Sequence, residues 1–136
     1  MYEIFEHTAD LGLRVQSTTR EQLFIEAASG LFSIVVANPE QVNPLLTKQL
    51  HVEGNEDDYL LFDWLNELLY TLETEKFLLA DCELRIDDQG LSAICRGETF
   101  DTERHISNHE VKAITYHALK VEQTADGWLA EVIVDI

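Results

Sequence analysis

The stretch that constrains the fold most strongly is Trp128-Leu-Ala-Glu-Val-Ile-Val-Asp135-Ile136. Chain termini are usually polar and frayed, so an apolar run at this position predicts a strand that is built into a sheet. Such a strand would hold the Asp135 side chain and the terminal carboxylate of Ile136 side by side. Two hard oxygen donors in one place suit a cation, so this end of the sequence is a candidate metal site.

The first residues of the sequence predict a β-hairpin. Residues 11–17 alternate apolar and polar side chains, which is typical of a half-buried strand. Residues 2–5 are the expected partner strand, and His7-Thr-Ala-Asp10 would join the two. A carboxylate at such a corner is either an ordinary turn residue, since Asp hydrogen-bonds nearby backbone amides, or a candidate ligand.

Two segments have the period of an amphipathic helix instead. The first begins after residues 18–22, which resemble a capping box, and it should end near Asn38-Pro39 because proline disfavours helix in the residue before it. The second covers residues 59–74 and follows a polar segment suited to capping. Its apolar side chains fall on one broad face: Leu61, Trp64, Leu65, Leu68 and Leu72.

The remaining segments read mainly as strands, at residues 48–53, 82–86, 91–96 and 111–121, with a loop over residues 38–47. Two helices among hairpin-connected strands predict an α+β fold. We expect a single domain over residues 1–136, in which the two helices pack on one face of a mostly antiparallel sheet as two layers.

The hairpin around Asp87-Asp-Gln-Gly90 has a consequence for the two cysteines. A symmetric turn would place Cys82 opposite Cys95 on neighbouring strands, whereas a bulge or a longer loop would break this pairing. Two cysteines do not make a disulfide scaffold, and in a reducing cytosol both thiols should stay reduced.

The charge of the chain narrows the choice of partners. The 136 residues include 26 Asp and Glu against 9 Lys and Arg, a net charge of −17. Such a surface repels phosphate backbones, so direct, tight nucleic-acid binding is not expected. The acidic surface favours cations or basic proteins as partners, or it serves only to keep the protein soluble. The sequence opens without a signal peptide and has no apolar stretch of membrane-spanning length, so we expect a cytoplasmic protein.

A second polar constellation is Glu110-Val-Lys-Ala-Ile-Thr-Tyr-His117. As a strand it would point Glu110 and Lys112 to one face and His117 to the other. Cross-strand ion pairing and a satisfied core or edge histidine are the ordinary explanations for these residues, and the sequence favours them over a functional role. The sequence has no glycine-rich phosphate loop, calcium loop, paired Cys/His motif or nucleophile elbow, and therefore no visible catalytic machinery.

Taken together, the segments resemble the archease family from end to end. The resemblance rests on an ordered set of motifs: His7-Thr-Ala-Asp-Leu-Gly-Leu-Arg-Val15, Ala27-Ala-Ser-Gly-Leu-Phe32, Asp63-Trp-Leu-Asn-Glu-Leu-Leu-Tyr70, Arg96-Gly-Glu98, Arg104-His105, Glu110-Val-Lys-Ala-Ile-Thr-Tyr-His117 and Val134-Asp-Ile136. Each motif is weak alone, but their order is highly specific.

The resemblance implies a small accessory protein that activates the GTP- and manganese-dependent RNA ligase of tRNA splicing. Such a protein has no ligase activity of its own; it promotes guanylylation and multiple turnover of the ligase and broadens its nucleotide use. The family's metal ligands correspond to Asp10, Asp135 and the terminal Ile136, and a position implicated in activation corresponds to Lys112. Oxygen ligands of this kind suit a divalent ion, Ca²⁺ or alternatively Mg²⁺ or Mn²⁺.

Two alternatives to ligase activation stay open. A stand-alone metal-dependent hydrolase would turn over substrate without a partner, and a metal-independent chaperone or adaptor would act regardless of chelators.

The predicted role of the Ile136 carboxylate has its own test, because a C-terminal tag should weaken metal binding and activation more than an N-terminal tag.

Overall fold

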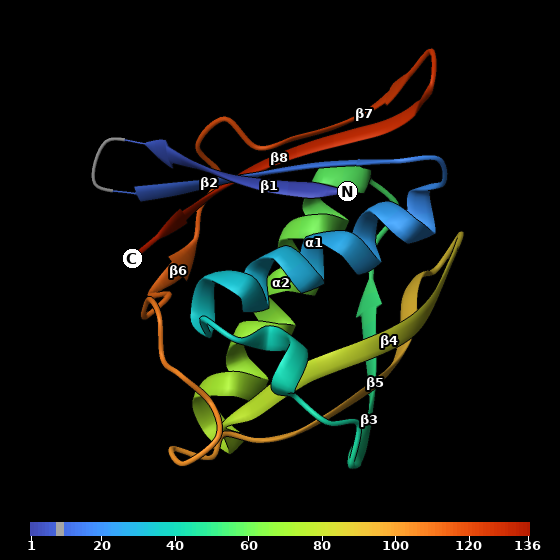
Figure 1. The fold of residues 1–136 in the computed structure, drawn as a ribbon. Helices are drawn as coiled ribbons and strands as arrows, with labels where there is room; N and C mark the ends of the chain where they lie inside the picture. Colours follow the sequence, from blue (N-terminus) through green and yellow to red (C-terminus); the bar gives the residue numbers. More distant parts are fainter. Residues whose placement is uncertain (8–9) are drawn as a thin grey trace.

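The computed structural model describes residues 1–7 and 10–136. The predicted α+β class is confirmed (Figure 1). In chain order the elements are β1 Tyr2–His7, β2 Asp10–Ser17, α1 Arg20–Val35, the short 3₁₀ helix η1 Pro39–Gln41, β3 Leu46–Glu53, α2 Asp57–Glu75, β4 Phe77–Asp87, β5 Gly90–Thr99, β6 Ala113–Ile114, β7 Lys120–Thr124 and β8 Gly127–Asp135. The predicted corner residues Thr8 and Ala9 lie outside the described residues.

The C-terminal strand β8 is the centre of the first sheet. It pairs with β2 on one side and with β7 and β6 on the other, while β1 pairs with β2 at the edge. All of these pairings are antiparallel, and the N-terminal hairpin has the predicted β1–β2 partners. The apolar run at the end of the sequence is therefore a buried central strand, as expected.

The strands form two sheets rather than the one predicted. The second sheet has the order β3-β5-β4, and both helices lie between the two sheets (Figure 1). The reason lies in α1, which packs against β2 of the first sheet and β4 of the second. Its buried residues cover most of the helix circumference and so need cover on both sides: Leu23, Phe24, Ala27, Ala28, Gly30, Leu31, Phe32 and Ile34.

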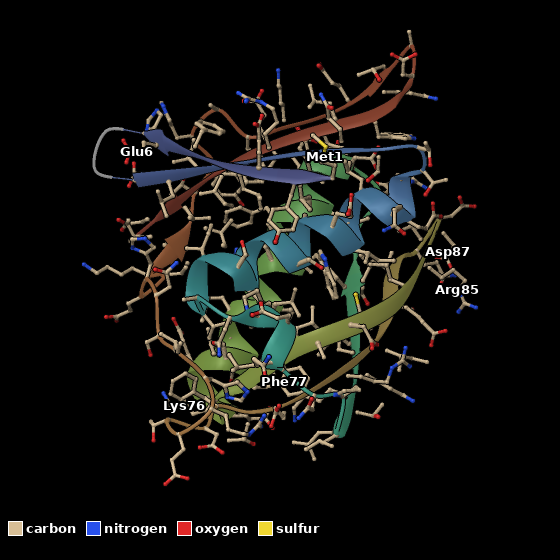
Figure 2. All side chains as sticks on the ribbon, in the orientation of Figure 1. Met1, Glu6, Lys76, Phe77, Arg85 and Asp87 are labelled. Atoms are coloured by element: carbon tan, nitrogen blue, oxygen red, sulfur yellow. The ribbon has the colours of Figure 1, made fainter. Side chains whose placement is uncertain are left out.

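The start of α1 and the end of α2 each have a local cause. The Thr19 hydroxyl accepts a hydrogen bond from the Gln22 N–H over 3.1 Å, so Thr19 is the N-cap of α1. Helix α2 ends at Glu75 and is capped by Lys76, whose φ of 58° is left-handed and whose N–H donates to the Leu72 carbonyl. The chain then turns directly into β4, where Phe77 is buried (Figure 2).

The β4–β5 hairpin has the register that the sequence predicts. Ile86 pairs with Leu91, Leu84 with Ala93, and Cys82 with Cys95, although both strands extend further than expected. Both cysteines are buried free thiols. Burial, and to a lesser extent the charge of Asp81, raises the pKa of Cys82 to about 11. Burial, followed by the neighbouring Cys82, raises the pKa of Cys95 to about 12.

We therefore expect both thiols to resist alkylation in the folded protein. At pH 8 a thiol with a pKa of about 11 is ionised in roughly one molecule in a thousand, and only the thiolate reacts. Iodoacetamide labelling followed by mass spectrometry should show almost no modification of Cys82 or Cys95 in buffer and complete modification of both in urea. Rapid labelling of the native protein would contradict the buried placement.

The predicted strand over residues 111–121 is wrong in its length. Strand β6 comprises only Ala113–Ile114, and β7 begins at Lys120 after a turn in which Ala118 has a φ of 55°. The physical reason is Tyr116, which leaves the sheet and stacks on Phe62 of α2 with 3.8 Å between ring centroids. Lys112, on the other side of β6, also lies outside any strand, and the alternation predicted for Glu110, Lys112 and His117 does not apply.

Candidate functional site

The β2–β8 pairing places Asp10 directly opposite Asp135. Each residue lies at the end of its strand, and both are half-buried. The preceding residue of β8, Val134, is fully buried in the core, so the alternation of the strand directs Asp135 to the outward face of the sheet. Two carboxylates from opposite ends of the sequence are thus brought together.

Lys112 and Ile136 lie at the same end of β8. The Lys112 N–H donates to the Asp135 carbonyl over 2.8 Å, and the next residue, Ala113, pairs with Asp135 in β6. Ile136 follows Asp135 and packs partly against the hydrophobic core, while the Lys112 side chain is exposed. In Figure 1 the chain end marked C lies near β6 and the start of β2. The structure therefore gathers all four residues that the sequence singled out.

Two histidines adjoin this group, and their contact could not be predicted. His7 pairs with Asp10 across the hairpin, with 3.7 Å between its Nδ1 and the Asp10 Oδ2. That Nδ1 is buried and has no hydrogen-bond partner among the described residues. The His117 ring lies 5.5 Å from the His7 ring, measured between centroids. The only sequence signal for this cluster was the proximity of His7 to Asp10 at a corner.

The donor set fits a divalent cation. Like charges directly opposite each other on neighbouring strands are destabilising, and a bound cation would remove that repulsion between Asp10 and Asp135. Within residues 1–7 and 10–136, no point is surrounded by three or more His, Cys, Asp or Glu side chains. The two carboxylates would therefore need backbone oxygens, such as that of Ile136, and water to complete the oxygen shell that Ca²⁺ and Mg²⁺ prefer.

A separate buried polar cluster joins Glu98, Arg104 and His105. Arg104 pairs with Oε1 of Glu98, and His105 Nε2 lies 3.3 Å from Oε2. The Asp101 N–H donates to His105 Nδ1 over 2.9 Å, so the proton of the neutral imidazole is on Nε2 and points at Glu98. Arg104 and His105 thus hold the loop after β5 in place, and neither reaches the Asp10–Asp135 pair.

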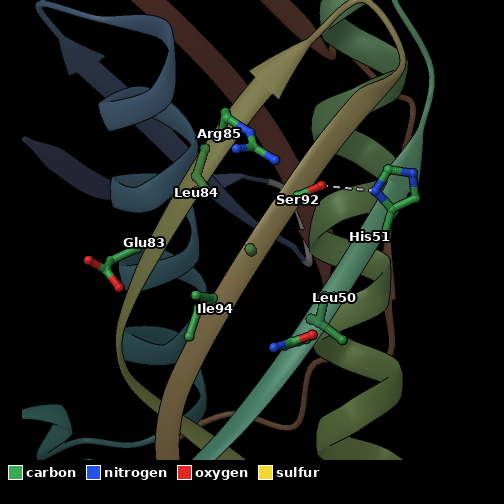
Figure 3. Close-up of a pocket in the computed structure, with 9 residues that line it drawn as sticks. Leu50, His51, Glu83, Leu84, Arg85, Ser92 and Ile94 are labelled. Carbon is green, nitrogen blue, oxygen red and sulfur yellow. Dashed lines mark hydrogen bonds between the residues drawn. The ribbon is translucent and has the colours of Figure 1, made fainter.

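A surface depression lies elsewhere, on the second sheet (Figure 3). It contains a His51–Ser92 pair with 3.1 Å between Nδ1 and Oγ, as well as Glu83 and Arg85. In the part of the chain that the structure describes, no carboxylate hydrogen-bonds to His51, so the third member of a hydrolytic triad is missing from this pair.

Fold and site define a small, acidic α+β protein with paired carboxylates at the end of a central strand. The chain belongs to the archease family: the profile of the Archease protein family (MTH1598/TM1083) matches residues 2–136. The family resemblance seen in the sequence is thereby confirmed. No helix in the described residues is long and apolar enough to cross a membrane.

Several relatives match over nearly their whole length. The archease of Pyrococcus furiosus is 38% identical over 99% of this chain and 98% of its own, and that of Methanopyrus kandleri is 37% identical over 99% of both. The solution structure of Methanobacterium thermoautotrophicum protein 1598 superposes with a TM-score of 0.80 at 29% identity, covering 99% of this chain and 98% of that one. A crystal structure of an archease from Thermotoga maritima, described as a possible chaperone, has a TM-score of 0.64 at 22% identity, covering 100% and 98%, and shares the fold.

Proposed function

We propose that this protein is a metal-binding accessory protein that activates the GTP- and manganese-dependent RNA ligase of tRNA splicing. It would promote guanylylation and multiple turnover of the ligase and broaden its use of nucleotides. The observation that carries the proposal is the direct pairing of Asp10 with Asp135 beside Lys112, in a chain of the archease family. A chaperone-like role, as suggested for the Thermotoga maritima protein, is compatible with action on another protein.

Each residue of the site has a distinct task in this proposal. Asp10, Asp135 and a backbone oxygen of Ile136 would hold a divalent metal ion, Ca²⁺ or alternatively Mg²⁺ or Mn²⁺. The ion would supply positive charge that organises phosphate oxygens of the nucleotide bound to the ligase. Lys112, exposed beside Asp135, places an ammonium group next to that point. The net charge of −17 would guide this end of the molecule into a basic cleft while disfavouring RNA binding by the protein alone.

The proposal is tested by Asp10→Asn, Asp135→Asn and Lys112→Ala proteins in a multiple-turnover ligation assay. We expect each variant to reduce the stimulated rate to near the rate of the ligase alone, because each removes one charge from the site. Asp126→Asn, which alters an exposed acidic residue in the β7–β8 turn, is the matched control and should stimulate fully. Undiminished stimulation by all three site variants would refute the proposal.

Metal binding is tested independently of the ligase. Calorimetric titration with CaCl₂, MgCl₂ or MnCl₂ should show one site, which Asp10→Asn or Asp135→Asn weakens by at least about tenfold, since a carboxylate ligand loses its charge. Stimulation that survives both a chelator and these substitutions would instead favour a metal-independent adaptor. Turnover of an RNA substrate without any ligase would favour a hydrolase.

A further inference from the structure

The outward face of α2 carries exposed aromatic residues where a helix usually carries only polar ones. Tyr59, Asp63, Asn66, Tyr70 and Glu73 follow one another at helical spacing and share this face. Tyr59 is 54% exposed and Tyr70 is 63% exposed. Large exposed aromatic side chains rimmed by polar groups are characteristic of interaction surfaces rather than of free surface.

A third tyrosine extends this face. Tyr116 stacks on Phe62 with an interplanar angle of 13°, and Tyr59 meets Tyr116 edge-on with 6.0 Å between centroids. Tyr116 nevertheless remains 57% exposed. The Tyr59 and Tyr116 rings are therefore held in fixed orientations before any partner arrives, which lowers the conformational entropy lost on binding. We call Tyr59, Asp63, Asn66, Tyr70, Glu73 and Tyr116 the aromatic stripe.

The aromatic stripe runs up to the candidate metal site. A shallow depression between α2 and the segment before β6 is lined by Tyr70 and Glu73 on one side and by Lys112 and Ala113 on the other. Ala113 pairs with Asp135, so a partner that contacts the site through Lys112 also meets the stripe. Glu67, exposed at the border of the stripe, lines the same depression.

We propose that the aromatic stripe docks an arginine-bearing basic segment of the protein partner. The carboxylates of Asp63, Glu67 and Glu73 flank the rings, which favours a cationic occupant and opposes an RNA strand. Arginine fits better than lysine because its planar guanidinium stacks on an aromatic face while it pairs with a carboxylate. The identity of the partner as the ligase rests on the proposed function, whereas the chemistry of the stripe does not.

A peptide-binding experiment tests the stripe without the ligase. The full-length protein is titrated into a fluorescein-labelled peptide of alternating arginine and serine, into its lysine counterpart and into a single-stranded RNA of equal length. We expect the arginine peptide to bind most tightly. The double variant Tyr59→Ala/Tyr70→Ala should weaken it about tenfold, because two cation–π contacts are lost.

Conservative and distant substitutions serve as controls. Tyr70→Phe keeps the ring and should bind like the wild type; Glu73→Gln should weaken binding, and Glu53→Gln, an exposed glutamate on β3, should not. Equal binding of the arginine peptide by the wild type and the double variant would overturn the proposal. Tighter binding of RNA than of the peptide would also overturn it.

The same double variant separates docking from activation. In a ligase titration it should raise the concentration of this protein that gives half-maximal stimulation, with the plateau retained, whereas the site variants lower the plateau. A lowered plateau with an unchanged half-maximal concentration would contradict docking by the stripe. If the wild type stimulates no ligase, the proposed function fails. The peptide experiment still tests whether the aromatic stripe binds an arginine-bearing segment.

Discussion

Replacing Trp64 with alanine is expected to lower the free energy of unfolding by about 3–5 kcal/mol. Trp64 is fully buried between the sheets, and its indole N–H donates to the Phe24 carbonyl of α1 over 3.0 Å. The substitution opens a large cavity and removes one of the side-chain hydrogen bonds between the two helices, the other being that of Arg20 with Asp57. Domains of this size are stable by about 5–15 kcal/mol, so a large part of the stability is lost. Urea unfolding followed by far-ultraviolet circular dichroism measures the change.

Two controls separate cavity formation from the hydrogen bond. Trp64→Phe keeps most of the buried ring but leaves the Phe24 carbonyl without the indole donor, and should cost about 1–2 kcal/mol. Trp128→Phe alters the other tryptophan, which is only half-buried, and should cost less than about 1 kcal/mol. A loss below about 1 kcal/mol for Trp64→Ala would show that this residue is not at the centre of the core.

The elements that the sequence predicts well are those with local causes. The Thr19 cap and the symmetric turn before Gly90 each act over a few residues, so the start of α1 and the β4–β5 register follow directly from the sequence. The division of the strands into two sheets depends instead on how α1 is covered on both sides. A helix that is buried over most of its circumference does not show from its sequence which strands cover it.

The candidate site could be predicted only in part. Apolar residues around Asp135 predicted a buried strand, but no local pattern indicates that Asp10 pairs with it; the family resemblance supplied that link, and the register then placed the two opposite each other. The strand predicted over residues 111–121 continued too far because alternation of polar and apolar residues does not reveal that Tyr116 stacks on α2. Long-range aromatic contacts of this kind override local strand propensity.

Glu98 is the buried charge on which the loop after β5 depends. Its carboxylate accepts a hydrogen bond from the Asn43 N–H over 2.6 Å, pairs with Arg104 and faces Nε2 of His105. Burial works to raise the pKa of Glu98, but the Asn43 N–H, the charge of Arg104 and the hydrogen bond from His105 hold this pKa below its ordinary value of 4.5. The folded state therefore favours the ionised form.

Replacing Glu98 with alanine is expected to lower the free energy of unfolding by about 2–4 kcal/mol, because it leaves His105 and the Asn43 N–H without their acceptor. Arg104 is partly exposed and can be rehydrated, which limits the loss. Glu83→Ala is the matched control, since Glu83 pairs with Arg96 at the surface, and it should cost less than about 1 kcal/mol. Urea unfolding of both variants at pH 7 measures the difference.

The pH dependence gives the Glu98 prediction a second, independent readout. A carboxyl whose pKa is lowered by folding stabilises the protein fully above its unfolded value of 4.5, and that stabilisation disappears as the pH falls through the lower folded value. The wild type should therefore lose more stability than Glu98→Ala between pH 6 and the acid range below about pH 4.5. The difference in stability between the two proteins should narrow there, because protonated Glu98 no longer forms an ion pair with Arg104. Parallel loss of stability in both proteins across this range would show that the Glu98 charge does not secure the loop.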